Sequence, residues 1–142
     1  MRKIFIDTCY LAGLIFPRDR LHKICVEIAS TLKNKPIRFY ISEFIFAETL
    51  TVFSKSGQYW KSKAVEMVDL MKNNPNVEVI PHTSNLYEKG EKLYRERMDK
   101  QYSHTDCTSM IIMKDKEINE ILTYDHHFEQ EGFFILLKEE EK

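Results

Sequence analysis

Two kinds of hydrophobic pattern alternate along the chain. Short apolar runs predict strands at Lys3–Ile6, Ile37–Ile41, Val77–Ile80, Glu120–Tyr124 and Phe133–Leu137. Between them, apolar residues recur every three or four positions, which predicts helices at Thr8–Phe16, Asp19–Lys33, Glu43–Ser54, Tyr59–Lys72, Thr83–Met98 and Asp106–Lys116. Strands that alternate with helices indicate an α/β domain with a parallel sheet.

Polar residues and prolines mark where these elements begin and end. Pro17 restricts the residue before it and so ends the first helix, while Asp19 is placed to cap the second. Ser42 is placed to cap the third helix, which is apolar on nearly every side and is therefore expected to be buried. A turn is expected at His126–Gln130, before the last strand.

The length and composition limit the classes to which the protein can belong. The 142 residues fit one domain, expected over residues 1–137 and followed by a charged tail at 138–142. Apolar residues make up 43% and charged residues 30%, the balance of an ordinary globular protein. No run approaches the roughly 18 apolar residues of a membrane span. The N-terminal apolar stretch is broken by Asp7 and lacks a small-residue cleavage site, so no signal peptide is expected.

The net charge and the spacing of the cysteines bear on the binding partners of the protein and on its cellular compartment. The net charge of −1 gives no sign of nucleic-acid binding, because proteins that bind nucleic acids by charge alone are basic. Such a function therefore needs support from a specific site. Cys9, Cys25 and Cys107 are irregularly spaced, which fits reduced thiols better than disulfides or a zinc site and favours the cytoplasm.

Four acidic residues stand in apolar surroundings, whereas most of the other acids lie on charged faces. Asp7 closes the first strand, Asp125 closes the fourth, and Asp106 opens the last long helix. Glu48 is the only acid in the apolar run Phe44–Phe53. In α/β sheets, ligands bind outside the carboxyl ends of the strands, so three of the four acids fall where a site is expected.

Each of these acids also has a structural explanation. Asp7 and Asp125 could cap the segments that follow them, and the dipole of its helix favours Asp106. Glu48 lies in mid-helix, where it caps nothing, and burying it unpaired costs several kcal/mol. Its structural partner would be one of two basic residues, Arg38 or Lys61.

If the four carboxylates converge, their repulsion must be relieved. At about 4 Å and an effective dielectric constant near 20, each pair costs on the order of 4 kcal/mol. Shared protons or a cation would remove this cost. Carboxylate oxygens suit Mg²⁺ or Mn²⁺ rather than zinc, and such ions usually serve phosphate chemistry. The residues alone thus indicate a metal-dependent phosphoryl site and leave its substrate open.

Four segments resemble one protein family, in the order that the family has them: FIDTCYL, SEFIFAETLT, SHTDCTSMII and LTYDHHFEQEGF. They are similar to PIN-domain ribonucleases, and most of all to VapC-type toxins of toxin–antitoxin pairs. The resemblance extends over almost the whole chain, and the last two segments are the most specific. It implies an α/β/α sandwich of three layers with a mainly parallel five-stranded sheet.

The resemblance also implies a site. The pocket that binds Mg²⁺ or Mn²⁺ and carries catalysis would contain Asp7, Glu48, Asp106 and Asp125. Thr8 and Ser109 match hydroxyl positions that help to orient metal-bound water or ligands, and Thr123 matches a further one. The implied reaction is hydrolysis of an RNA phosphodiester by metal-activated water, without a covalent nucleophile.

Partners follow from the same resemblance. A toxin of this type is expected to have a cognate antitoxin, often with a basic side chain in the acidic pocket, and to form a homodimer through apolar helix faces. With no basic patch, RNA affinity is expected to come from the metal and a few residues such as Arg18, Arg20 or Lys61. For His104 and His126, which lie near the acids, a surface role is expected, and the role of His127 stays open.

Three alternatives compete with an RNA-cleaving toxin. A PIN nuclease of RNA maturation or decay would need no antitoxin, although the small size of the chain favours the toxin. A phosphatase of the haloacid-dehalogenase kind would require a second aspartate where Cys9 stands. A PIN module that only binds a partner would have little reason to hold four repelling acids.

Overall fold

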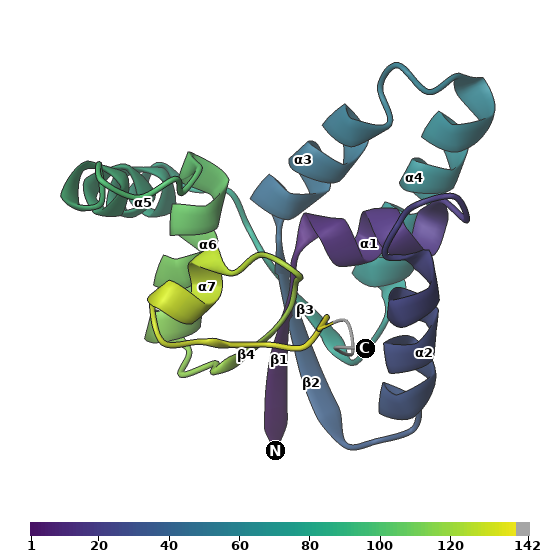
Figure 1. Cartoon of the computed structure of the whole chain (residues 1–142), viewed down its shortest axis with the longest axis horizontal. Helices are drawn as coiled ribbons and strands as arrows, with labels where there is room; N and C mark the ends of the chain where they lie inside the picture. Colours follow the sequence, from purple (N-terminus) through teal and green to yellow (C-terminus); the bar gives the residue numbers. More distant parts are fainter. Residues whose placement is uncertain (139–142) are drawn as a thin grey trace.

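A five-stranded sheet forms the centre of the molecule, with helices on both faces (Figure 1). The computed structural model describes residues 1–138. Within them the strands, all parallel, are β1 (Arg2–Ile6), β2 (Ile37–Ser42), β3 (Val77–Ile80), β4 (Glu120–Leu122) and β5 (Phe134–Ile135). The expected α/β/α sandwich with a mainly parallel five-stranded sheet is confirmed.

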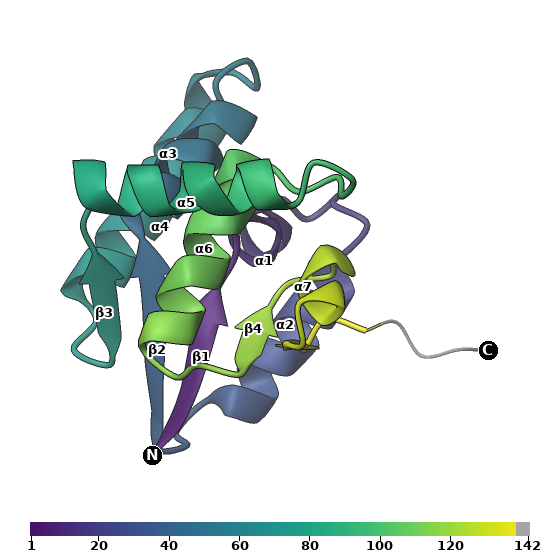
Figure 2. The same ribbon diagram turned by 90° about the vertical axis from the view of Figure 1, so that its left-hand side faces the viewer.

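The helices form two layers around the sheet. They are α1 (Thr8–Ile15), α2 (His22–Leu32), α3 (Glu43–Val52), α4 (Gln58–Asn73), α5 (Ser84–Glu96), α6 (His104–Asp115) and α7 (His127–Gln130). Helices α5 and α6 cover one face of the sheet, and α1, α2 and α4 cover the other (Figures 1 and 2). Because both faces are covered, the middle of β1 is apolar on both sides, and Ile4 and Phe5 are fully buried.

The strand order β3-β2-β1-β4-β5 places a reversal of strand order next to β1, although all the strands run in the same direction. The chain passes from β1 outward through β2 to β3, then crosses to β4 on the other side of β1. The connections therefore diverge at the carboxyl ends of β1 and β4, where α/β sheets form their ligand sites.

Helix α6 is fixed at its start and along one side. Ser103 Oγ accepts a hydrogen bond from the Asp106 N–H at 3.0 Å, and Asp106 Oδ2 accepts one from the Ser103 N–H at 3.0 Å, so the two residues form a capping box. Further along, α6 packs closely against Gly90 of α5, where a Cβ atom would lie 2.6 Å from Cγ2 of Thr108. The spacing of these two helices therefore requires glycine at this position.

Several element boundaries differ from those predicted. Asp19 does not cap α2: its Oδ1 accepts the Leu21 N–H at 2.8 Å and closes a turn ahead of a helix that begins at His22. Strand β4 stops at Leu122, and β5 is shorter than predicted at both ends. The turn predicted at His126–Gln130 contains the short helix α7.

The prediction that the third helix is buried was wrong. One face of α3 is buried, but Leu50 and Val52 on the other face are 41% and 51% exposed, and Glu48 is only partly buried. The helix extends from the carboxyl end of β2, and its outer face meets solvent (Figure 1). Its uniform apolar sequence therefore provides both a core face and an exposed apolar surface.

The cysteines agree with the prediction of reduced thiols. Cys25 and Cys107 are buried, Cys9 is partly buried, and all three are free. Among residues 1–138, none of the helices has both the length and the apolar character needed to cross a bilayer. Apart from Lys138, the predicted charged tail lies outside the described residues.

Candidate active site

A cavity of about 770 Å³ opens at the carboxyl ends of β1 and β4. Its walls come from α1, α3, α6 and α7 together with the turn that precedes α2. All four acids singled out in the sequence line it: Asp7, Glu48, Asp106 and Asp125. The fold thus brings together carboxylates from four separate parts of the chain.

Asp7, at the end of β1, is the most deeply placed of these acids. Its side chain is 7% exposed, and its Oδ2 accepts a hydrogen bond from Thr123 Oγ1 at 2.7 Å. Burial raises the pKa of Asp7 to about 7, and the carboxylates of Asp106 and Glu48 push it in the same direction, against the lowering effect of the Thr123 hydroxyl. With its pKa at about 7, Asp7 is close to the midpoint between its protonated and charged forms at neutral pH, and a cation nearby would favour the charged form.

Thr123 joins the ends of the two central strands. It follows β4, it is fully buried, and besides donating to Asp7 its Oγ1 accepts the Asp125 N–H at 3.1 Å. A single hydroxyl therefore fixes the side chain of one acid and the backbone of another. This is a positioning role, reached through the hydrogen bonds of Thr123 rather than through direct exposure to the cavity.

Asp106 combines a structural role with a place in the cavity. Its Oδ2 completes the capping box of α6, as the helix-start explanation requires. Burial raises the pKa of Asp106, the charges of Asp125 and Glu48 raise it further, and the hydrogen bonds of Ser103 oppose the shift. Capping alone therefore does not account for this carboxylate, which lies among others of the same charge.

Glu48 faces the cavity from α3. The proposed structural partners do not account for it: Arg38 pairs with Glu78 at 3.5 Å, and Lys61 lines a separate cavity near the turn between α3 and α4. The carboxylate of Glu48 instead raises the pKa values of Asp7 and Asp106. Since it is only partly buried, the cost of desolvation is smaller than its apolar neighbours in the sequence imply.

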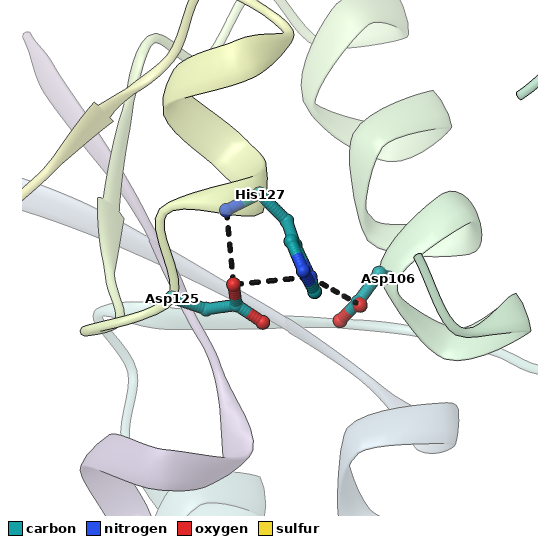
Figure 3. A group of neighbouring side chains, drawn as sticks. All are labelled: Asp106, Asp125 and His127. Atoms are coloured by element: carbon teal, nitrogen blue, oxygen red, sulfur yellow. Dashed lines mark hydrogen bonds and ion pairs between the residues drawn. The ribbon is translucent and has the colours of Figure 1, made fainter. Parts of the chain in front are cut away.

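Asp125 and His127 form the wall of the cavity next to α7 (Figure 3). Asp125 Oδ1 accepts the His127 N–H at 2.9 Å, which turns the chain so that the imidazole lies over the acids. His127 Nδ1 is 3.0 Å from Asp125 Oδ1 and 3.6 Å from Asp106 Oδ2. The three side chains offer ligand atoms that all lie within 4.8 Å of one another. In the sequence, the Asp-x-His spacing was the only feature that indicated a place for His127 near the acids.

The other two histidines that lie near the acids in the sequence have surroundings of a different kind. His126 is 65% exposed and lies 3.4 Å from Glu129, as expected for a surface residue, although it also borders the cavity. His104 packs on Tyr87 with ring centroids 4.4 Å apart, and its Nε2 is 3.0 Å from the Tyr87 carbonyl oxygen. These contacts connect α6 to α5.

Two buried hydroxyls have no hydrogen-bond partner within the part of the chain that the structure describes: Thr8 Oγ1 and Ser109 Oγ. Thr8 is 6% exposed and lines the cavity directly beside Asp7. Ser109 is fully buried and lies three residues after Asp106 on α6. A buried hydroxyl is normally satisfied, so these atoms have room for an additional polar ligand or water.

This set of donors fits a hard divalent cation. Carboxylate oxygens predominate, the charges of neighbouring acids raise the pKa values of Asp7 and Asp106, and Thr8 and Ser109 provide hydroxyls that have no partner among the described residues. A divalent ion would remove the repulsion that the carboxylates exert on each other.

Basic side chains reach the cavity at one point. Arg20 lines it, with its guanidinium 4.6 Å from the centroid of the Tyr124 ring, which lines it as well. Arg18 is exposed in the same turn, and Lys61 belongs to the other cavity. Of the three basic residues singled out in the sequence, Arg20 is the one placed beside the acids.

Solved structures of known proteins share this fold. VapC20 of Mycobacterium tuberculosis, described as a sarcin-ricin loop cleaving toxin, superposes with a TM-score of 0.81 at 24% identity, over 94% of this chain and 98% of that one. VapBC2 of Rickettsia felis, solved with a promoter DNA fragment, gives 0.63 at 15% identity, over 94% and 96%. FitAcB of Neisseria gonorrhoeae gives 0.62 at 15% identity, over 93% and 95%.

Comparison with curated protein sequences gave no significant match. The sequence profile of the PIN domain, in contrast, matches residues 4–133, which include most of β1, all of β2, β3 and β4, and the four acids singled out in the sequence. The resemblance carried by the four sequence segments is thereby confirmed, and the chain belongs to the PIN-domain family of nucleases.

Proposed function

We propose that this protein is a metal-dependent endoribonuclease and the toxin of a type II toxin–antitoxin pair. The observation that carries the proposal is the convergence of four carboxylates in one cavity, with the pKa of Asp7 raised to about 7. Membership of the PIN-domain family supports the nuclease, and the likeness to VapC20, described as a sarcin-ricin loop cleaving toxin, supports the toxin.

The residues have separate tasks in this proposal. Mg²⁺ or Mn²⁺ would be held by the four carboxylates, Asp7, Glu48, Asp106 and Asp125. When bound, the ion would supply a water of lowered pKa and neutralise charge on the phosphate. Thr8 and Ser109, with their unpartnered hydroxyls, would orient water or the ligand, and Thr123 would hold Asp7 in place.

The proposal includes a cytoplasmic protein with a cognate antitoxin and a homodimer. Apolar side chains available for such contacts project from α3 and α4: Leu50, Val52 and Val65 are between 41% and 51% exposed. Exposed apolar surface of this kind is typical of protein interfaces. A nuclease of RNA maturation or decay, without an antitoxin, is the second candidate, and it shares the same site.

Cleavage assays test the nuclease directly. Wild type and Asp7→Asn are incubated with single-stranded and hairpin RNA in Mn²⁺, then with a chelator. We expect cleavage by the wild type to stop in chelator and Asp7→Asn to lose activity by at least about 100-fold, since it lacks a charge at the deepest position. His126→Asn, which changes an exposed side chain at the cavity rim, serves as the control and should keep most activity. Activity that survives both Asp7→Asn and the chelator contradicts the mechanism.

The toxin assignment has its own test. A small DNA-binding protein encoded by the neighbouring upstream reading frame should bind the wild type and suppress its RNA cleavage. Absence of such a frame, together with unimpaired growth when the active enzyme is expressed, would favour the nuclease of RNA maturation or decay.

A further inference from the structure

We propose that His127 supplies a nitrogen ligand to the metal of this site and gives it a preference for Mn²⁺ over Mg²⁺. The inference rests on the proposed function, because it concerns the same ion. The carboxylates alone form an all-oxygen site with little reason to distinguish the two ions. An imidazole among them changes the chemistry, because nitrogen favours transition ions over Mg²⁺.

The position of one ring nitrogen is the first support. His127 Nδ1 lies between two carboxylates, 3.0 Å from Asp125 Oδ1 and 3.6 Å from Asp106 Oδ2 (Figure 3). It is buried, yet neither contact has the alignment of a hydrogen bond, and no other described residue bonds to it. A nitrogen that is shielded from water and lies between two carboxylates, without an aligned hydrogen bond to either, is placed as a ligand atom.

The ring is held in place by the backbone and by an aromatic neighbour. The backbone N–H of His127 donates to Asp125 Oδ1 at 2.9 Å, and the ring packs on Tyr102 with centroids 5.4 Å apart. Tyr102 in turn donates to Glu131 Oε1 at 3.0 Å, and Arg97 Nε donates to the same oxygen at 2.7 Å. This network fixes α7 against the loop before α6, so the imidazole is positioned without any contribution from a metal.

A second, independent feature points to a ligand at the same place. Thr8 Oγ1 lines the cavity, is 6% exposed, and has no partner among the described residues. With the acids, the cavity therefore contains oxygen and nitrogen donors that the protein itself leaves unsatisfied. Such a mixed donor set is what a first-row transition ion prefers.

Two substitutions separate the ligand role from a packing role. His127→Phe keeps a ring against Tyr102 but removes both nitrogens, and His127→Asn offers an amide oxygen in their place. His126→Phe is the matched control, since it changes the neighbouring histidine, which is 65% exposed and pairs with Glu129. Circular dichroism and thermal unfolding without metal establish that each variant folds.

The experiment measures binding of Mn²⁺ and Mg²⁺ by isothermal titration calorimetry, and the surroundings of bound Mn²⁺ by pulsed electron paramagnetic resonance. In the wild type we expect modulation of the Mn²⁺ signal by a directly bound nitrogen and tighter binding of Mn²⁺ than of Mg²⁺. His127→Phe should lose the nitrogen modulation, and its ratio of Mn²⁺ to Mg²⁺ affinity should fall on the order of tenfold. His127→Asn should lose the modulation while keeping its affinity for Mg²⁺, and His126→Phe should match the wild type.

The outcomes distinguish this inference from the proposed function. If Mn²⁺ binds and Asp7→Asn abolishes binding, but no nitrogen modulation is seen or the affinity ratio is unchanged in His127→Phe, the ligand role of His127 is wrong and the metal site stands. If neither ion binds the wild type and Asp7→Asn changes nothing, the metal-dependent mechanism itself fails.

Discussion

At the scale of single residues, Thr123 positions more of the site than its small side chain suggests. Its hydroxyl donates to Asp7 and accepts from the backbone of Asp125. Thr123→Val keeps the shape but leaves the partly buried Asp125 N–H without an acceptor and takes a donor from the buried Asp7 carboxylate, so the free energy of unfolding should drop by about 1–3 kcal/mol. Urea denaturation measures the loss. RNA cleavage should fall as well, because the orientation of Asp7 is no longer fixed.

Thr108→Val provides the matched control for that substitution. Thr108 is also fully buried, but its hydroxyl donates only to the Thr105 carbonyl oxygen within α6. Thr108→Val should lower the free energy of unfolding less than Thr123→Val does, and it should leave RNA cleavage intact. Equal effects of the two substitutions on cleavage would contradict the positioning role of Thr123.

The charge of Asp7 predicts a dependence of stability on pH in metal-free buffer. Its pKa is raised from 3.8 to about 7, chiefly by burial, so the folded protein holds this proton more tightly than the unfolded chain does. The stabilisation that this proton provides is complete below the pKa of Asp7 in the unfolded chain. It is lost as the pH rises through the pKa of Asp7 in the folded protein. Between about pH 5 and about pH 8 the free energy of unfolding of the wild type should fall by on the order of 3 kcal/mol, a loss that Asp7→Asn should not show.

Denaturation of both proteins at several pH values, in chelator, measures that difference. Adding Mn²⁺ at the higher pH should restore the wild type but not Asp7→Asn, because the ion takes the place of the proton. Parallel pH profiles for the two proteins would show that Asp7 is charged at no cost, contrary to this prediction.

At the scale of elements, the start of α6 couples helix stability to the site. Ser103 caps the helix, and the same carboxylate that completes the capping box, Asp106, lines the cavity. Ser103→Ala should lower the free energy of unfolding by about 1 kcal/mol and weaken metal binding too, because Asp106 loses one of the contacts that orient it.

Helix α5 offers a control with the same kind of cap. Thr83 Oγ1 accepts the Leu86 N–H at 3.1 Å, on a helix whose cap contributes nothing to the cavity lining. Thr83→Ala should cost a similar amount of stability in thermal unfolding and leave metal affinity unchanged. If both variants bind metal alike, the capping box of α6 is structural only.

At the scale of the whole molecule, the balance of charge predicts how RNA is held. With a net charge of −1 and Arg20 as the basic residue seen beside the acids, few phosphates can be neutralised by side chains. For about two such contacts the slope of log affinity against log salt concentration is near −1.4 for single-stranded RNA. Binding of inactive Asp7→Asn to labelled RNA at increasing salt measures it, and a slope steeper than about −4 would require a broad basic surface instead.

Much of this architecture was predictable because it follows from hydrophobic pattern. The strand β1 and the acid that ends it were clear, since a short apolar run closed by Asp7 is local in sequence. The convergence of the acids was inferred from the rule that sites form where parallel strands end. Helix α3 was harder, because its apolar sequence does not reveal that Leu50 and Val52 face outward.

The contacts that pattern could not predict are those between side chains and backbone. The role of Thr123 depends on β4 stopping at Leu122, two residues earlier than the apolar run suggests. The place of His127 depends on a turn closed by Asp125, and that of Asp19 on a turn that replaces a helix cap. The turns at Asp125 and Asp19 rest on local hydrogen bonds that compete with regular structure, and propensity does not resolve such competition. The hydrogen bond from Thr123 to Asp7 joins residues 116 apart, which local pattern does not relate.

The central position of β1 has a consequence for biosynthesis. Strand β1 is made before the other strands of the sheet, yet one of its two neighbours is β4, and the hydroxyl that donates to Asp7 belongs to Thr123, 116 residues further along the chain. Contacts so distant in sequence form late in folding, after the intervening loop has been closed. A nascent chain would therefore not complete the candidate site until β4 and Thr123 have been made, which would delay the proposed hydrolysis of RNA near the ribosome.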